Sequence, residues 1–287
     1  MNDPNGLIYY AGEYHLFYQY LPGATEDQGP KHWGHAVSSD LVRWQHLPPA
    51  LYPDHRGAIW SGSAVVDWND TSGLQTGVEK VMVAAFTRWD EGDQQQGIAY
   101  SNDRGRNWTM YPGNPVIPNP GIRDFRDPKV FWHQASNQWV MLVAAGDRVM
   151  IYTSPNLREW TLGSEFGERE GSHGGVWECP DLFELAVDGE PNNRKWVMLV
   201  SVGGGGPPGD GSGGVQYFIG DFEGTTFTNQ CSAEVVRWVD HGRDNYAGVT
   251  FSDIPQEDGR RIFLGWMSNW SYAQDVPTSP WRGAIGL

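Results

Sequence analysis

The sequence predicts an all-β protein, a five-bladed β-propeller with a central axial pocket. Fifteen Trp, 12 Tyr and 11 Phe occur beside 37 Gly and 19 Pro, a composition typical of many short strands joined by tight turns. A turn signature followed by an aromatic residue recurs along the chain, and the segments between the turns lack helical periodicity. A β-sandwich is the alternative fold with the same composition.

The repeated turn consists of Asp or Asn after a strand, with an aromatic residue four to six positions later. Asp and Asn suit such turns because their side chains can bond the backbone two residues on. The four instances are Ser39-Asp40…Trp44, Asn102-Asp103…Trp108, Pro155-Asn156…Trp160 and Gly220-Asp221…Phe227.

Two apolar strands precede each turn, which gives four units of the same plan. The predicted strand pairs are 14–20 and 32–38, 81–88 and 97–101, 139–145 and 149–153, and 196–202 and 215–220. A fifth unit begins near Tyr246, with strands around 249–252 and 261–268, and reaches Leu287 before an outermost strand. Four strands per unit in five units is the pattern of a five-bladed propeller.

The net charge and the length of the apolar runs exclude several classes of partner and of protein. The 20 Lys and Arg against 35 Asp and Glu give a formal net charge of −15, which disfavours nucleic acid and anionic membrane surfaces. The longest apolar runs, such as 81–86, are too short to cross a bilayer. Two cysteines, Cys179 and Cys231, are not a disulfide framework.

Acidic residues stand at the entrances of three predicted innermost strands, at Asp3, Asp127 and Glu178. The innermost strand of every propeller blade lines the central channel, so these entrances should meet in one pocket. Two carboxyl groups on either side of a bond are the equipment of glycoside cleavage, one as nucleophile or base and the other as acid. Isolated Asp-Pro pairs are often only turn caps, but three acids at equivalent positions of three strands favour a catalytic pocket.

Three motifs carry a family resemblance: Asn2-Asp3-Pro4-Asn5-Gly6, Phe125-Arg126-Asp127-Pro128 and Trp177-Glu178-Cys179-Pro180. They resemble the signatures of glycoside hydrolase family 32, the invertases, inulinases and levanases. Further similar stretches run along the chain: 17–19, 32–35, 60–63 and 266–270. The resemblance implies a retaining double displacement on terminal β-D-fructofuranosyl linkages of levan, inulin and sucrose, with exo action.

The resemblance also implies roles for individual residues. Asp3 would be the nucleophile, Glu178 the acid/base, and Asp127 the stabiliser that holds sugar hydroxyls. Arg126 would pair with the carboxylates, and Cys179 would tune the acid, although an ordinary buried thiol is an equal reading. The implied sugar-binding residues are Asn2, Gln19, Trp33, Trp60, Ser61, Arg126 and one or both of Trp266 and Trp270.

The family usually carries a Trp before the first motif and a C-terminal β-sandwich after the propeller, and neither occurs here. We therefore expect residues 1–287 to be one catalytic propeller domain truncated at both ends. We expect the protein to be secreted, with a cytoplasmic location as the alternative. A fructan or sucrose substrate is the expected partner.

No cofactor or metal is expected. His32 and His35 lie three apart in a predicted strand, so their side chains should face opposite ways. Two other functions stay open. One is an inverting propeller hydrolase of the arabinanase and β-xylosidase type, and the other is a sugar-binding propeller without catalysis.

Overall fold

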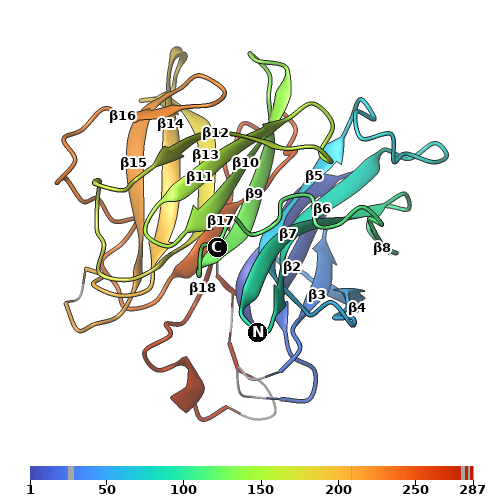
Figure 1. Cartoon of the computed structure of the whole chain (residues 1–287), viewed down its shortest axis with the longest axis horizontal. Coiled ribbons are helices and arrows are strands. Elements are labelled where there is room, and N and C mark those ends of the chain that lie inside the picture. The colour runs from blue at the N-terminus through green and yellow to red at the C-terminus, as the bar shows by residue number, and fades with distance from the viewer. Residues whose placement is uncertain (25–28, 208, 279–281, 284, 287) are drawn as a thin grey trace.

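The structure is a computed structural model of the 287-residue chain, and it describes all residues except 25–28, 208, 279–281, 284 and 287. Four antiparallel four-stranded sheets follow one another along the chain and form the blades (Figure 1). In each blade the strands pair in chain order. The bounds of the first two blades are β1 (Asn2–Tyr10), β2 (Glu13–Tyr20), β3 (His32–Ser38), β4 (Gln45–Leu51), β5 (Ala58–Asp67), β6 (Val81–Asp90), β7 (Asp93–Ser101) and β8 (Thr109–Met110).

The third and fourth blades have the same plan. Their strands are β9 (Phe125–His133), β10 (Gln138–Ala145), β11 (Val149–Ser154), β12 (Thr161–Phe166), β13 (Trp177–Val187), β14 (Glu190–Val202), β15 (Gly214–Phe222) and β16 (Phe227–Asn229). Every strand pair predicted for these four units therefore lies within an observed strand pair of the same blade.

The prediction of five blades is wrong: the residues that the structure describes form four. The residues expected to form a fifth blade make a smaller sheet of three strands, β17 (Tyr246–Thr250), β18 (Phe263–Trp266) and β19 (Ile285–Gly286). Turn-forming residues interrupt this stretch. The turn closed by Pro255 and Asp258 lies between the two predicted strands, whereas the 3-10 helix η1 (Ala273–Asp275) follows β18, and the last strand, β19, has only two residues.

The three-stranded sheet closes the ring against the first blade. The Tyr9 amide donates to the Ser252 carbonyl (3.0 Å), and the Ser252 amide donates to the Leu7 carbonyl (2.9 Å). A hydrophobic cluster that includes Leu7, Leu16, Val249 and Leu264 fills the space between these two sheets. The first sheet is thus covered on both sides, by the second blade and by the three-stranded sheet.

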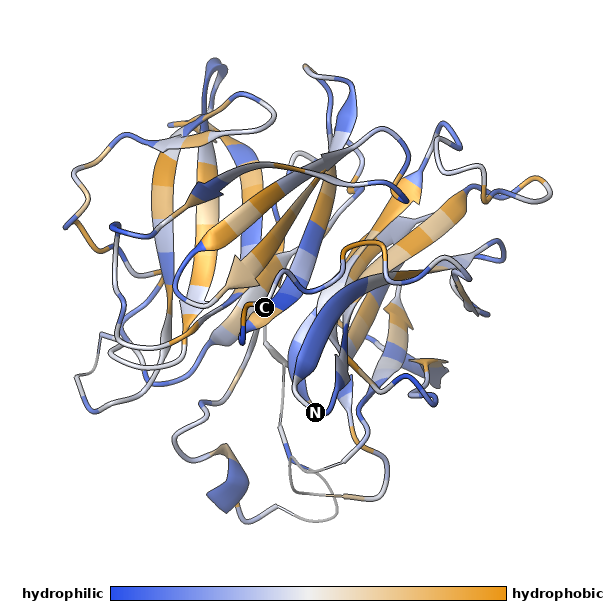
Figure 2. Ribbon diagram, viewed as in Figure 1, coloured by the Kyte–Doolittle hydropathy of each residue, from blue (hydrophilic) through white to orange (hydrophobic). Residues whose placement is uncertain are grey.

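The rest of the core lies between neighbouring blades. Separate clusters join blades one and two, two and three, and three and four. Their apolar residues show as hydrophobic segments within the strands, whereas the connecting loops are mostly hydrophilic (Figure 2). Burial on both faces explains why the inner strands read as continuous apolar runs rather than as alternating patterns.

The repeated turn has one geometry in three blades. In each, the indole N–H of the closing tryptophan donates to a carbonyl three residues earlier at 3.0 Å. The pairs are Trp44 with Leu41, Trp108 with Gly105, and Trp160 with Leu157. The signature therefore marks the link from the third to the outermost strand of a blade.

Candidate active site

The innermost strands of the four blades and β17 converge around the axis, where neighbouring inner strands are in contact. At the end of the channel formed by the strand entrances lies a cavity of about 500 Å³. Asp3, Asp127 and Glu178 all line it. The remaining lining residues are Asn2, Gln19, Gly29, Lys31, Trp60, Ser61, Trp89, Gln94, Asp124, Arg126 and Trp270.

A β-bulge at each strand entrance aims these side chains. In β9, residues 127 and 128 stand opposite one residue of β10, and in β13 residues 179 and 180 stand opposite one residue of β14. Asp127 (φ 63°) and Cys179 (φ 46°) take the left-handed conformation there. Such strain in non-glycine residues is typical of functional sites, and bulges often re-aim side chains beside them.

The three acids do not occupy equivalent positions. Asp127 lies inside the bulge of β9, whereas Glu178 is the last paired residue before the bulge of β13 and corresponds to Arg126. Asp3 is an extra residue of β1, between Asn2 and Pro4, which pair with consecutive residues of β2. Convergence of the acids therefore depends on the bulges as well as on the repeat.

Neutral donors hold Asp3. The Ser61 hydroxyl donates to Oδ2 (2.7 Å) and the Asn2 amide to Oδ1 (2.9 Å). Cys179 connects this carboxylate to Asp127. Its thiol lies 4.0 Å from Asp3 Oδ2 and 3.7 Å from Asp127 Oδ2, and its backbone N–H donates to Asp127 Oδ2 at 3.0 Å.

Charged and phenolic donors hold Glu178. Arg126 Nε donates to Oε1 at 3.0 Å, and the Tyr246 hydroxyl donates to Oε2. Arg126 also bonds Asp124 Oδ1 (2.7 Å) and Gln94 Oε1 (3.2 Å), and it lies 3.9 Å from Asp127 Oδ2. The guanidinium is fixed on several sides and joins three carboxylates.

Burial and like charges perturb the ionisation of Asp127. Burial raises the pKa of Asp127 to about 7 against the attraction of Arg126, and the negative charges of Glu178 and Asp3 add to the rise. Burial also raises the pKa of Cys179 well above its usual value, and the three carboxylates add to that effect. The thiol is therefore neutral and acts as a weak donor to the acids.

Most of the predicted sugar-binding residues reach the cavity: Asn2, Gln19, Trp60, Ser61, Arg126 and Trp270 line it. The structure does not bring Trp33 there. Its side chain is fully buried in the core between blades one and two, and its indole N–H donates to the Trp60 carbonyl at 2.9 Å. Trp33 thus supports the strand that carries Trp60 and Ser61.

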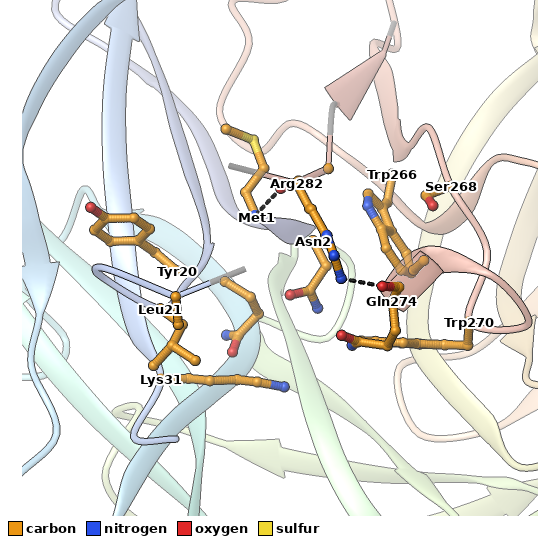
Figure 3. Close-up of a pocket in the computed structure, with 14 residues that line it drawn as sticks. Met1, Asn2, Tyr20, Leu21, Lys31, Trp266, Ser268, Trp270, Gln274 and Arg282 are labelled. Atoms are coloured by element: carbon orange, nitrogen blue, oxygen red, sulfur yellow. Dashed lines mark hydrogen bonds between the residues drawn. The ribbon is translucent and has the colours of Figure 1, made fainter. Parts of the chain in front are cut away.

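The sequence did not decide which of Trp266 and Trp270 lines the sugar pocket, and the structure places them differently. Trp270 lines the acid-bearing cavity, whereas Trp266 is 2% exposed and faces a smaller adjoining pocket. Their ring centroids are 4.7 Å apart, so the Trp266 ring supports that of Trp270. Figure 3 shows both rings together with Asn2 and Lys31 in this adjoining pocket.

Sequence reasoning missed five site residues: Lys31, Trp89, Gln94, Asp124 and Tyr246. Trp89 stacks on Trp60, with ring centroids 5.5 Å apart and planes 3° apart. The Lys31 ammonium lies 5.4 Å from the Trp60 ring and 5.9 Å from the Trp270 ring. Of these five residues, Asp124 could have been predicted from the sequence, because it lies two residues before Arg126 and an acid so close to an arginine is a natural ion-pair partner.

Among the residues that the structure describes, no three His, Cys, Asp or Glu side chains are grouped so as to hold a metal ion. No helix in the described part of the chain is long and apolar enough to cross a membrane.

An all-β propeller with a carboxylate-lined axial cavity defines the class of protein. The whole chain, residues 1–287, matches the family model described as "Glycosyl hydrolases family 32 N-terminal domain". The chain therefore belongs to glycoside hydrolase family 32, as its motifs predicted.

Two curated relatives show the range of similarity. The chain is 66% identical to a levanase of Bacillus subtilis over 287 residues, which cover all of this chain and 42% of that protein. It is 43% identical to an extracellular exo-inulinase of Aspergillus niger over 319 residues, with 58% of that protein covered. The chain thus spans about half the length of the curated relatives that it matches.

Solved structures agree with the fold. An exo-inulinase from Aspergillus awamori matches with a TM-score of 0.93 and 42% identity, covering all of this chain and 60% of that one. A β-fructofuranosidase from Schwanniomyces occidentalis complexed with fructosyl-erythritol matches with the same TM-score and identity, and 56% of it is covered.

Proposed function

We propose that this domain hydrolyses terminal β-D-fructofuranosyl linkages of fructans and sucrose, with retention of configuration and exo action. The observation that carries the proposal is the group of three carboxyl groups joined through Arg126 and Cys179 inside one cavity. The family and the relatives named levanase and exo-inulinase support a fructan substrate. A β-fructofuranosidase with bound fructose among the structural matches supports the same sugar.

Asp3 is the proposed nucleophile. Its two oxygens accept bonds from the neutral donors Ser61 and Asn2, which hold it in place without pairing it with a cation. It attacks C2 of the terminal fructosyl unit, the bond to the leaving oxygen breaks, and a covalent fructosyl-enzyme forms.

Glu178 is the proposed acid/base. It gives its proton to the leaving oxygen in the first step and takes a proton from water in the second, so that the enzyme returns to its starting state. The hydrogen bonds from Arg126 and Tyr246 fix the orientation of the carboxyl group. Asp127 is assigned to the sugar hydroxyls, which a buried carboxyl group beside the nucleophile can hold through the transition state.

The cavity wall suits the rest of the sugar. The amides of Asn2 and Gln19 and the hydroxyl of Ser61 are the proposed partners of fructose hydroxyls, and the Trp60 and Trp270 rings wall the pocket. Trp33 and Trp266 are proposed to support these rings from behind. Relatives described as extracellular support a secreted full-length protein.

Product analysis tests this function. The parent protein is incubated with levan, inulin and sucrose beside the variants Asp3→Asn and Glu178→Gln. We expect fructose as the only product from the polymers, and a loss of at least about 10³-fold in kcat for each variant. Glu165→Gln is the control, because Glu165 lies on the outer strand β12 and pairs with Arg148. Equal rates in the parent and both site variants would contradict the mechanism.

The stereochemical outcome separates the competing mechanisms. Early NMR spectra of the released sugar should show β-fructofuranose before mutarotation if configuration is retained. Release of the α anomer would indicate the inverting alternative, and binding of fructan without any product would indicate a sugar-binding propeller.

A further inference from the structure

A second layer of ionisable residues lies beneath the acids, where β9, β13 and β17 meet again. The Lys129 ammonium contacts Asp181 Oδ2 (3.2 Å) and donates to the Thr250 carbonyl (2.7 Å). Thr250 also donates to Asp181 Oδ2, through its backbone N–H (2.7 Å) and its hydroxyl (2.8 Å). We call these three residues the channel node.

The charged side chains of the channel node are buried. The side chain of Lys129 is 7% exposed and that of Asp181 is 0% exposed. The Leu182 amide donates to the other oxygen of Asp181 at 2.8 Å, so both oxygens of this carboxylate are bonded. A buried ion pair contributes little net stability because desolvation opposes it, whereas its geometry is specific. The Lys129–Asp181 pair is therefore suited to hold the strands that carry it in one arrangement.

The bulges of β9, β13 and β17 lie between the channel node and the active-site residues along each strand. Arg126, Glu178 and Tyr246 are the last paired residues before the bulges of β9, β13 and β17, and Glu178 accepts a hydrogen bond from each of the other two. Lys129 and Asp181 are the first paired residues after two of those bulges. Thr250 comes one residue after the equivalent position of β17.

Little space separates the two layers. The cavity between them is about 10 Å³, roughly the room for one water molecule, and its lining includes Asp127, Cys179, Lys129 and Thr250. On its other side the channel node borders a cavity of about 1050 Å³ at the far end of the channel. On the side of the acids, a shift of the node therefore meets the bulges with almost no empty space between them.

We propose that the channel node is a positioning device that fixes the bulges of β9, β13 and β17, and through them the carboxyl groups of Asp127 and Glu178. The proposal rests on the proposed function for its kinetic consequence only. Lys129, Asp181 and Thr250 are positioning residues: they are separated from the acid-bearing cavity by the bulges and do not line it.

Thr250 offers the finest test, because Thr250→Val removes one hydrogen bond to Asp181 at nearly constant volume, whereas Thr250→Ser keeps it. We expect kcat of T250V on levan to fall about three- to tenfold with KM within twofold of the parent. T250S should retain the parent kcat. A purely stabilising role would lower the melting temperature of T250V and leave kcat at a temperature where all variants are folded.

The double variant Lys129→Met and Asp181→Leu removes both members of the ion pair together, so that neither is left buried without the other. We expect kcat to fall at least tenfold even if the melting temperature is kept. If this variant does not fold, the T250V and T250S pair still decides. Parent-like kcat in T250V, and in the double variant when it folds, would overturn the proposal.

Crystal structures of the parent and T250V provide a readout that does not require fructosidase activity. We expect the Glu178 and Asp127 carboxyl groups to move and the Arg126–Glu178 bond to lengthen. Unmoved carboxyl groups would refute the positioning role. A parent that releases no fructose from any substrate would refute only the proposed function.

Discussion

The two layers of the central channel satisfy their charges in opposite ways. At the cavity, four carboxyl groups (Asp3, Asp124, Asp127 and Glu178) share the lining with two cations, Lys31 and Arg126. One bulge further along the same strands, Lys129 is hydrogen-bonded to the carboxylate of Asp181, and both oxygens of that carboxylate have partners. The difference indicates that the first layer is built for reactive charge and the second for fixed geometry.

Arg126→Lys is expected to lower the activity strongly, because Arg126 joins the carboxyl groups of the acid layer. Lysine keeps the charge but cannot bond Glu178, Asp124 and Gln94 together, because it lacks the planar fork of the guanidinium. We expect kcat/KM on levan to fall about 10³-fold, equivalent to about 4 kcal/mol. Arg148→Lys is the control, since Arg148 pairs with Glu165 on the outer strands. Near-parent activity of R126K would show that charge alone suffices there.

Asp127→Asn should change how the free energy of unfolding depends on pH, and this separates the acid layer from the channel node. The pKa of Asp127 is raised to about 7 by burial and by its charged neighbours, so the folded state keeps this proton while the unfolded state releases it from about pH 4 upward. The parent therefore loses stability between pH 4 and pH 7, and an asparagine does not.

Urea unfolding across this pH range measures the effect. Relative to the parent, D127N should gain up to about 4 kcal/mol in free energy of unfolding between pH 4 and pH 8, with loss of activity. Asp181→Asn is the matched change in the channel node and should destabilise at every pH, because it weakens a bonded ion pair. If the free energy of unfolding of D127N and D181N depended on pH in the same way, the proposed difference between the two layers would be wrong.

A third prediction concerns a buried pair away from the channel, His15 and His35, whose ring nitrogens are 3.1 Å apart. Burial lowers the pKa of His15 to about 4 and that of His35 to about 2. Their folded pKa values lie below the unfolded value of about 6.5, so stability is complete above that pH and falls as the pH drops toward 4.

Unfolding of His15→Gln at pH 7 and pH 4 checks this. The variant should lose about 3 kcal/mol less than the parent over that interval, because one unfavourable protonation is gone. His241→Gln is the control, since His241 is exposed. The same loss in H15Q and in the parent would place the acid sensitivity elsewhere, with the crowded carboxyl layer as the next region to test.

The smallest predicted effect compares the two ends of the channel. Trp270→Ala removes a ring from the acid-bearing cavity and should raise KM for levan about tenfold, equivalent to about 1.4 kcal/mol. Trp68→Ala removes a half-exposed ring from the far cavity and should leave KM unchanged. A raised KM in W68A would mean that the far cavity also contributes to substrate binding.

The strands of four blades could be predicted from the sequence because each repeats the same turn chemistry. The Trp44, Trp108 and Trp160 indoles bond the preceding turn in the same way, so one local rule sets three blade edges. The fifth blade was predicted by continuing the repeat. After β18, however, the 3-10 helix η1 follows and β19 has only two residues, so the residues that the structure describes form four blades.

The approach of the acids could also be predicted, but their fine placement could not. Sequence spacing does not show that Glu178 corresponds to Arg126, because that relation depends on where each bulge inserts its extra residues. For the same reason Tyr246 was seen as a strand start but not as a partner of Glu178. Trp33 was expected in the cavity wall. It pairs with Gln19, which does line the cavity, but it stands on the third strand of the blade, one strand further from the axis, and its ring lies in the core between blades one and two.

Closure of the ring through Tyr9 and Ser252 has a consequence for how the protein becomes active. The residues of the acid-bearing site come from both ends of the folded ring, with Asp3 on its first strand and Tyr246, the partner of Glu178, on its last sheet. A partly assembled ring that lacks the first blade or the last sheet therefore lacks some of these site residues. Appearance of activity during refolding should therefore coincide with the final docking of the last sheet onto the first, and catalysis itself becomes a reporter of finished folding.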